Sequence, residues 1–139
     1  MKRFFLPILC LIIIFAMSCE DTNFYCSDCN TKEPYEATLK CQIDIDDKNG
    51  TLVQIWEGKL EDNILIDSTR IPRSSTTKVF NKKVPLNRHY TITATYIIDN
   101  KTYVAVGSAL PRIKHTDKCD EPCYYIYGNE VNLQLKYTK

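Results

Sequence analysis

Cysteines are the residues of this chain whose type and spacing most directly predict chemistry. Four of the seven cysteines form two short-spaced pairs, Cys26 with Cys29 and Cys119 with Cys123, in polar sequence typical of turns. Sulfurs at such spacings form disulfides in an oxidising compartment or bind zinc as four thiolates. The two pairs therefore predict covalent or metal-mediated cross-links.

The sequence leaves the pairing of these cysteines open. Each pair can close on itself, or the first pair can bridge to the second and tie the N-terminal segment to the domain. We favour disulfides over a four-cysteine zinc site, because residues 1–18 resemble an export signal and exported chains enter an oxidising compartment. A redox-active CxxC normally lies where a strand meets a helix, whereas Pro34 and no helical periodicity follow Cys29. We accordingly predict disulfides and no metal.

The remaining polar residues form no catalytic motif. His89 and His115 each lie beside a basic residue and outside any metal-binding or triad pattern. Asp44, Asp46 and Asp47 resemble part of a calcium loop but lack its other ligands, so they indicate a turn with solvated carboxylates. No glycine-rich phosphate loop is present in the sequence. We therefore predict a protein that is not an enzyme and takes no cofactor.

Residues 1–18 have the layout of an export signal. Two basic residues precede an apolar run from Phe4 to Met17, which is shorter than the roughly 20 residues of a membrane-spanning helix. The run ends in Ala16-Met17-Ser18-Cys19, which resembles the lipobox of bacterial lipoproteins. This resemblance implies cleavage before Cys19 and acylation of its thiol, and multiple acyl chains anchor a protein firmly to a membrane.

The residues that follow Cys19 refine this expectation. Glu20 and Asp21 resemble the acidic surface-export signal of Bacteroidetes-type lipoproteins, which implies an outer-membrane location on either its surface or its periplasmic face. Residues 19–34 are polar and lack periodicity, so we predict a lipidated tether there and one domain over residues 35–139.

Charge excludes one class of partner. Without the signal, 121 residues remain, with 16 basic and 17 acidic side chains of interspersed sign. Such a chain is long enough for one small domain with a core. It has no basic stripe or patch of the kind that binds nucleic acid, so we predict none as a partner.

Apolar and polar residues alternate along residues 35–139, and this alternation predicts β-strands. In residues 37–45 the odd positions are apolar, which directs Cys41 into the core as an unpaired thiol. Asn49-Gly50 is a hairpin signal, and residues 89–106 form the clearest hairpin, with a turn at Asp99-Asn100. Other strands are predicted at residues 52–57, 64–69, 76–84 and 131–137. Residues 107–122 are predicted as a long connection, and residues 124–127 as either a short strand or a packed aromatic flap.

About seven strands of this kind predict an all-β antiparallel sandwich that buries Leu39, Ile55, Ile92 and Leu133 between two sheets. The segment VPLNRHYTIT at residues 84–93 and the paired strand after it resemble small transthyretin-like or carboxypeptidase-regulatory-like domains. The chain also resembles short single-domain Bacteroidetes lipoproteins. These resemblances imply a fold and a setting, and they assign no site residues.

Aromatic residues indicate where such a domain would make contacts. Trp56 falls on the opposite face of its strand from the core residues, and Tyr124, Tyr125 and Tyr127 crowd one short segment. Tyrosine and tryptophan suit protein and sugar contacts, because each offers a ring together with a polar group. We therefore expect a membrane-anchored, non-catalytic binding or accessory module that contacts another envelope protein. The alternative is a glycan-binding surface lipoprotein of a nutrient-uptake system.

Overall fold

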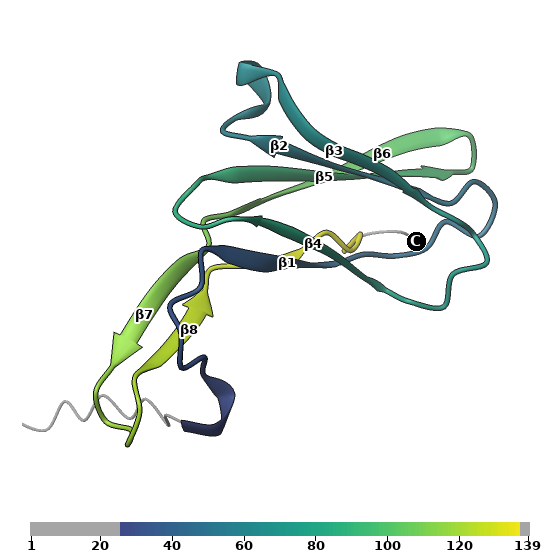
Figure 1. Ribbon diagram of the computed structural model, residues 1–139. Helices are drawn as coiled ribbons and strands as arrows, with labels where there is room; N and C mark the ends of the chain where they lie inside the picture. Colours follow the sequence, from purple (N-terminus) through teal and green to yellow (C-terminus); the bar gives the residue numbers. More distant parts are fainter. Residues whose placement is uncertain (1–25, 137–139) are drawn as a thin grey trace, which may run out of the picture.

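The computed structural model describes residues 26–136 as an assembly of short strands (Figure 1). Within these residues, no helix is both long enough and apolar enough to cross a membrane. The elements are the short 3-10 helices η1 (Cys26–Asp28) and η2 (Leu60–Asp62) and the strands β1 (Glu36–Gln42), β2 (Thr51–Glu57), β3 (Ile64–Ile71), β4 (Val79–Pro85), β5 (Tyr90–Ile98), β6 (Lys101–Ala109), β7 (Arg112–Thr116), β8 (Cys123–Tyr127) and β9 (Glu130–Asn132).

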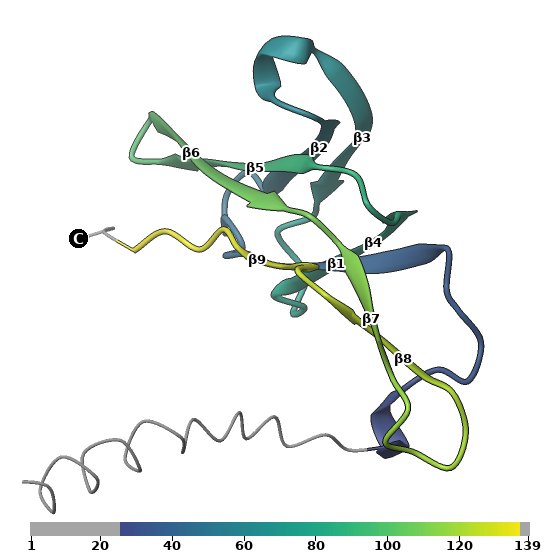
Figure 2. The same ribbon diagram turned by 90° about the vertical axis from the view of Figure 1, so that its left-hand side faces the viewer.

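Two sheets form a sandwich, which confirms the predicted all-β architecture. One sheet has the strand order β3-β2-β5-β6 with antiparallel pairing throughout. The other has the order β4-β1-β9, in which β1 pairs antiparallel with β4 but parallel with β9. The hairpin of β7 and β8 forms a third, two-stranded sheet that extends away from the sandwich (Figures 1 and 2).

The core lies between the facing sheets, where the alternation of the sequence placed it. Leu39, Ile55, Ile92 and Leu133 are at most 1% exposed, as predicted. Full burial of one such aliphatic side chain stabilises a fold by about 1.5–3 kcal/mol. The same cluster contains Cys41, Ile43, Val53, Val84, Tyr90, Ala94, Tyr96, Ala109 and Val131.

The hairpin of β5 and β6 has the predicted tight turn. Asp99 and Asn100 both have positive φ, 50° and 60°, which is the requirement of a type I′ turn. This turn matches the twist of antiparallel strands, so it fixes the register in which Tyr96 lies opposite Tyr103.

The segment around Asn49-Gly50 is a turn but not the predicted hairpin. Gly50 has a φ of 69°, yet β1 and β2 belong to different sheets. Each of these strands has one apolar face, and the two faces pack against each other across the core rather than side by side. The turn therefore carries the chain from one sheet to the other.

Residues 26–136 contain nine strands rather than the predicted seven or so, and the additional strand lies in the C-terminal third. The predicted connection at 107–122 contains β7, and β6 continues to Ala109. The last strand is shorter than predicted, since β9 covers only Glu130–Asn132. Leu133 is nevertheless buried, and its backbone is held by 2.8 Å hydrogen bonds from its N–H to the carbonyl oxygen of Gln42 and from the Tyr96 hydroxyl to its carbonyl oxygen. Tyr137 lies outside the described residues.

Candidate functional site

Two disulfides join the segment before the sandwich to the β7–β8 hairpin. Cys26 is bonded to Cys119 and Cys29 to Cys123, with Cα–Cα distances of 5.9 and 5.3 Å. This result selects the cross-bridged pairing from the alternatives that the sequence left open. The backbones of Asn30 and Tyr124 add two mutual hydrogen bonds of 2.8 and 2.9 Å. We call residues 26–30 together with the β7–β8 hairpin the clasp.

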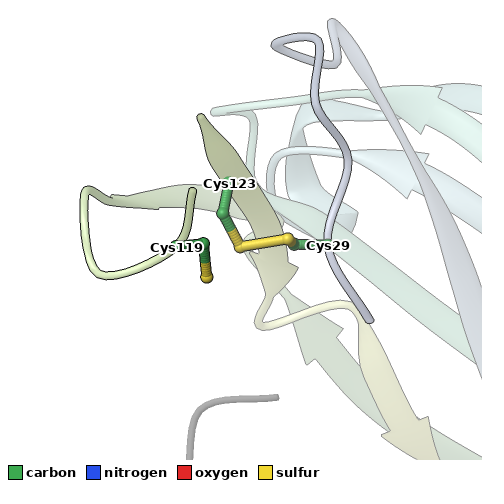
Figure 3. Close-up of side chains that lie close together, drawn as sticks. All are labelled: Cys29, Cys119 and Cys123. Atoms are coloured by element: carbon green, nitrogen blue, oxygen red, sulfur yellow. A yellow bond between two sulfur atoms is a disulfide. The ribbon is translucent and has the colours of Figure 1, made fainter. Parts of the chain in front are cut away.

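The sulfur atoms of the clasp are clustered. Those of Cys29, Cys119 and Cys123 lie within 4.8 Å of one another (Figure 3). Cys123 is completely buried, whereas Cys26 is exposed. The cluster therefore has a closed side at β8 and an open side at η1.

Cys41 is the free cysteine among the described residues, as predicted, and it lies in the core. Burial raises the pKa of the Cys41 thiol to about 11. The thiol is therefore protonated at neutral pH, and a protonated thiol is neither a nucleophile nor a metal ligand.

The three tyrosines of β8 do not share one surface. In the register with β7, Tyr125 pairs with Lys114 and Tyr127 with Arg112, while Tyr124 pairs with His115. Neighbouring residues of a strand point to opposite faces, so Tyr124 faces away from the other two. The Tyr124 ring lies 4.7 Å from that of His115, centroid to centroid. Tyr127 is 44% exposed.

The side of the β3-β2-β5-β6 sheet that points away from the core forms a second candidate surface, which we call the outer face. Leu65, Val104 and Val106 on this face are 46%, 54% and 57% exposed. By the strand register, the face consists of Leu65, Ser68 and Arg70 of β3, Leu52, Gln54 and Trp56 of β2, Thr91, Thr93, Thr95 and Ile97 of β5, and Thr102, Val104, Val106 and Ser108 of β6. It combines aliphatic side chains with hydroxyl groups and carries one charged residue.

Trp56 lies on the outer face, opposite the core residues of β2, as the alternation predicted. It pairs with Leu65 of β3 and Thr91 of β5, and a bulge precedes it in the pairing with β3. The indole Nε1 is buried and has no hydrogen-bond partner among the described residues. Trp56 and the β8 tyrosines thus belong to different sheets.

The carboxylates at the first turn have structural partners. Asp46 is 7% exposed rather than solvated, which corrects the prediction for this residue. Burial by itself raises its pKa, but hydrogen bonds from the backbone N–H groups of Asn49, Ile97 and Lys48 outweigh burial and hold the pKa below its usual value. Asp44 accepts a 2.9 Å hydrogen bond from the backbone N–H of Leu135. Both carboxylates therefore join separate chain segments.

The histidines make local contacts far apart in the fold. His89 Nδ1 lies 3.3 Å from the carbonyl oxygen of Gly58, and His115 Nε2 lies 3.3 Å from a carboxylate oxygen of Asp117. His89 stands before β5, whereas His115 belongs to β7.

The export signal and the lipidation site at Cys19 lie outside the described residues, so they stay predictions. Comparison with family models, with curated proteins and with solved structures found no match to this chain.

Proposed function

We propose that this protein is a lipid-anchored accessory module of the cell envelope, which binds another envelope protein through its outer face. The observation that carries the proposal is the exposure of aliphatic side chains on that face. Val104 and Val106 share one side of β6, and Ile97 on the same face of the neighbouring β5 is 37% exposed. A contiguous exposed apolar surface on a small domain marks an interaction site. Thr95 and Thr102 on this face, which are half-buried and exposed respectively, offer hydroxyl groups that can hydrogen-bond to a partner.

The clasp gives such a module a defined attachment. The anchor at Cys19 would lie seven residues before Cys26, and Cys26 and Cys29 are covalently joined to the β7–β8 hairpin. Figure 1 places this hairpin at the end of the sandwich opposite the β5–β6 turn. A chain anchored in this way presents its outer face along the side of the sandwich.

A protein partner accounts for the geometry better than a glycan does. A glycan-binding platform needs several exposed aromatic rings on one face, but Tyr124 faces away from Tyr125 and Tyr127, and of these three only Tyr127 is exposed. The most exposed apolar side chains of the outer face are aliphatic, and they have no aromatic ring on which a sugar can stack.

Crosslinking on native cells, followed by purification of the chain and mass spectrometry, tests the proposal. We expect an acylated Cys19 and a reproducible crosslinked protein. Replacing Val104 and Val106 together by lysine is expected to reduce the crosslinked fraction at least about tenfold, the equivalent of 1.4 kcal/mol of binding. Val79→Lys is the matched control, because Val79 is 40% exposed on β4 of the other sheet.

Two results would count against the proposal in different ways. A chain without acyl groups on Cys19 would contradict the anchor. Equal crosslinking by the outer-face variant and by the Val79 control would contradict the assignment of the binding surface.

A further inference from the structure

Three of the four clasp cysteines have sulfurs close enough to share one metal ion. Three of the sulfurs lie within 4.8 Å of one another, and the fourth, that of Cys26, is bonded to one of the three. Zinc holds thiolate sulfurs at about 2.3 Å, which places the sulfurs of a tetrahedral site about 3.8 Å apart. The sulfurs of Cys29, Cys119 and Cys123 therefore lie within reach of one ion, and Cys26, exposed in η1, would join them by rotation of its side chain once the disulfides are reduced.

We propose that the reduced form of the clasp binds one Zn²⁺ through Cys26, Cys29, Cys119 and Cys123. The disulfides and the zinc site are then two states of the same four residues. In both states residues 26–30 stay joined to the β7–β8 hairpin. The inference concerns the clasp and does not rest on the function proposed for the outer face.

The backbone that carries the sulfurs has supports other than the disulfides. Asn30 and Tyr124 exchange two backbone hydrogen bonds, and Cys123 pairs with Thr116 in the β7–β8 ladder. The Cα atoms of the bonded cysteines are 5.9 and 5.3 Å apart, so the thiols remain neighbours when the sulfur–sulfur bonds are broken. The exposed position of Cys26 gives a cation access to the cluster.

The conversion balances with a dithiol as the reductant. Each protein disulfide accepts two electrons and two protons from one dithiol, which is itself oxidised to a disulfide. Two equivalents therefore give four protein thiols. One Zn²⁺ then displaces four protons and is held by four thiolates. Soft thiolate ligands select zinc over magnesium or calcium.

The test uses the full chain purified in detergent, reduced under anaerobic conditions and titrated with Co²⁺ and then with Zn²⁺. We expect one Co²⁺ per chain, with the intense visible absorption of a tetrahedral tetrathiolate site, and displacement of that Co²⁺ by Zn²⁺. Bound zinc should protect four cysteines from alkylation. The oxidised chain should show neither the absorption nor the binding.

Variants separate this site from adventitious binding. Cys119→Ser is expected to lose the tetrathiolate spectrum, because it removes a ligand at the centre of the cluster. Cys41→Ser is the matched control, since Cys41 lies in the core and should leave the spectrum unchanged.

Three outcomes would overturn the inference. One is a reduced chain that keeps its β-sheet circular dichroism but binds no stoichiometric metal. Another is a tetrathiolate spectrum that survives Cys119→Ser. If reduction unfolds the chain, zinc added during refolding should restore the β-sheet signal, and failure to restore it is the third.

Discussion

Tyr96 shows how single polar atoms join the two sheets. Its ring is buried in β5, and its hydroxyl donates to the carbonyl oxygen of Leu133 at 2.8 Å and accepts from the backbone N–H of Asp44 at 3.2 Å. The chain segments after β1 and after β9 are thereby held to the opposite sheet. An unpaired buried polar group costs about 1–3 kcal/mol.

Tyr96→Phe should therefore lower the free energy of unfolding by about 1–3 kcal/mol, because it leaves the partners of the hydroxyl without it. Urea denaturation measures the change. Tyr103→Phe is the matched control, since Tyr103 lies opposite Tyr96 in the β5–β6 register but is 38% exposed. An equal effect of the two substitutions would refute this account of Tyr96.

Asp46 makes part of the stability depend on pH. Its pKa is held below the usual value in the folded chain by three backbone N–H donors that outweigh the opposing effect of burial. A carboxylate with a depressed folded pKa stabilises the fold above its unfolded pKa, about 3.9, and loses that contribution as pH falls through the folded value.

Asp46→Asn should therefore destabilise the chain at pH 7, and the difference from the unsubstituted chain should shrink as pH falls below about 4. Urea midpoints measured at pH 7 and at pH 3 give the comparison. Asp47→Asn serves as control, because Asp47 is exposed in the same turn. A difference that stays constant over this range would rule out the proposed linkage.

Strands β6 and β9 lie so close together at Gly107 that no side chain fits there. Gly107 lies on the core side of β6, where a Cβ atom would collide with Val131 Cγ1 and lie 3.1 Å from Leu133 Cδ2. Its neighbours on this side are Ala105 and Ala109, so small residues make room for β9.

Gly107→Ala should consequently destabilise the chain by about 1–3 kcal/mol, the usual cost of overpacking a core. Thermal unfolding followed by circular dichroism measures the effect. Ser108→Ala is the control, because Ser108 is exposed on the outer face and its substitution should leave the stability nearly unchanged. A Gly107→Ala chain as stable as the unsubstituted one would show that β9 can move away.

The same strand shows what the sequence could and could not reveal. Alternation predicted β1, β2, β5 and β6, because each has one face in the core. Hydrophobicity alone would place Val104 and Val106 inside, but the approach of β9 assigns the core side to Ala105 and Gly107 and exposes the valines. The outer face thus depends on a contact between strands that are distant in sequence.

The sequence identified the cysteines of the clasp but not which of them are bonded to each other. The spacing of the four cysteines identified disulfide candidates, but their pairing depends on long-range distances that spacing does not contain. β7 was missed because its sequence, RIKHT, has no apolar alternation. It belongs to a hairpin that projects from the sandwich (Figure 2), so no residue of β7 is fully buried.

At the scale of the whole molecule, the two disulfides close nearly the same loop. Cys26–Cys119 spans 93 residues and Cys29–Cys123 spans 94. Closing a loop of about 100 residues stabilises a fold by about 4.7 kcal/mol through the entropy of the unfolded chain. Once either disulfide is present, the other closes only the short loops within the CxxC and CxxxC pairs, so most of that entropy has already been lost.

The losses of unfolding free energy caused by removing each disulfide alone should therefore sum to much less than the loss caused by removing both. Replacing all four cysteines by serine should lower the free energy of unfolding by about 4–5 kcal/mol. Replacing only Cys26 and Cys119 should lower it by well under half of that amount. Replacing Cys29 and Cys123 alone should likewise cost little. Urea denaturation of the three variants and of the unsubstituted chain gives the four free energies of a double-mutant cycle between the two disulfides. Equal and additive losses would mean that each disulfide stabilises its own surroundings in the folded state, and that the shared loop through the unfolded chain contributes little.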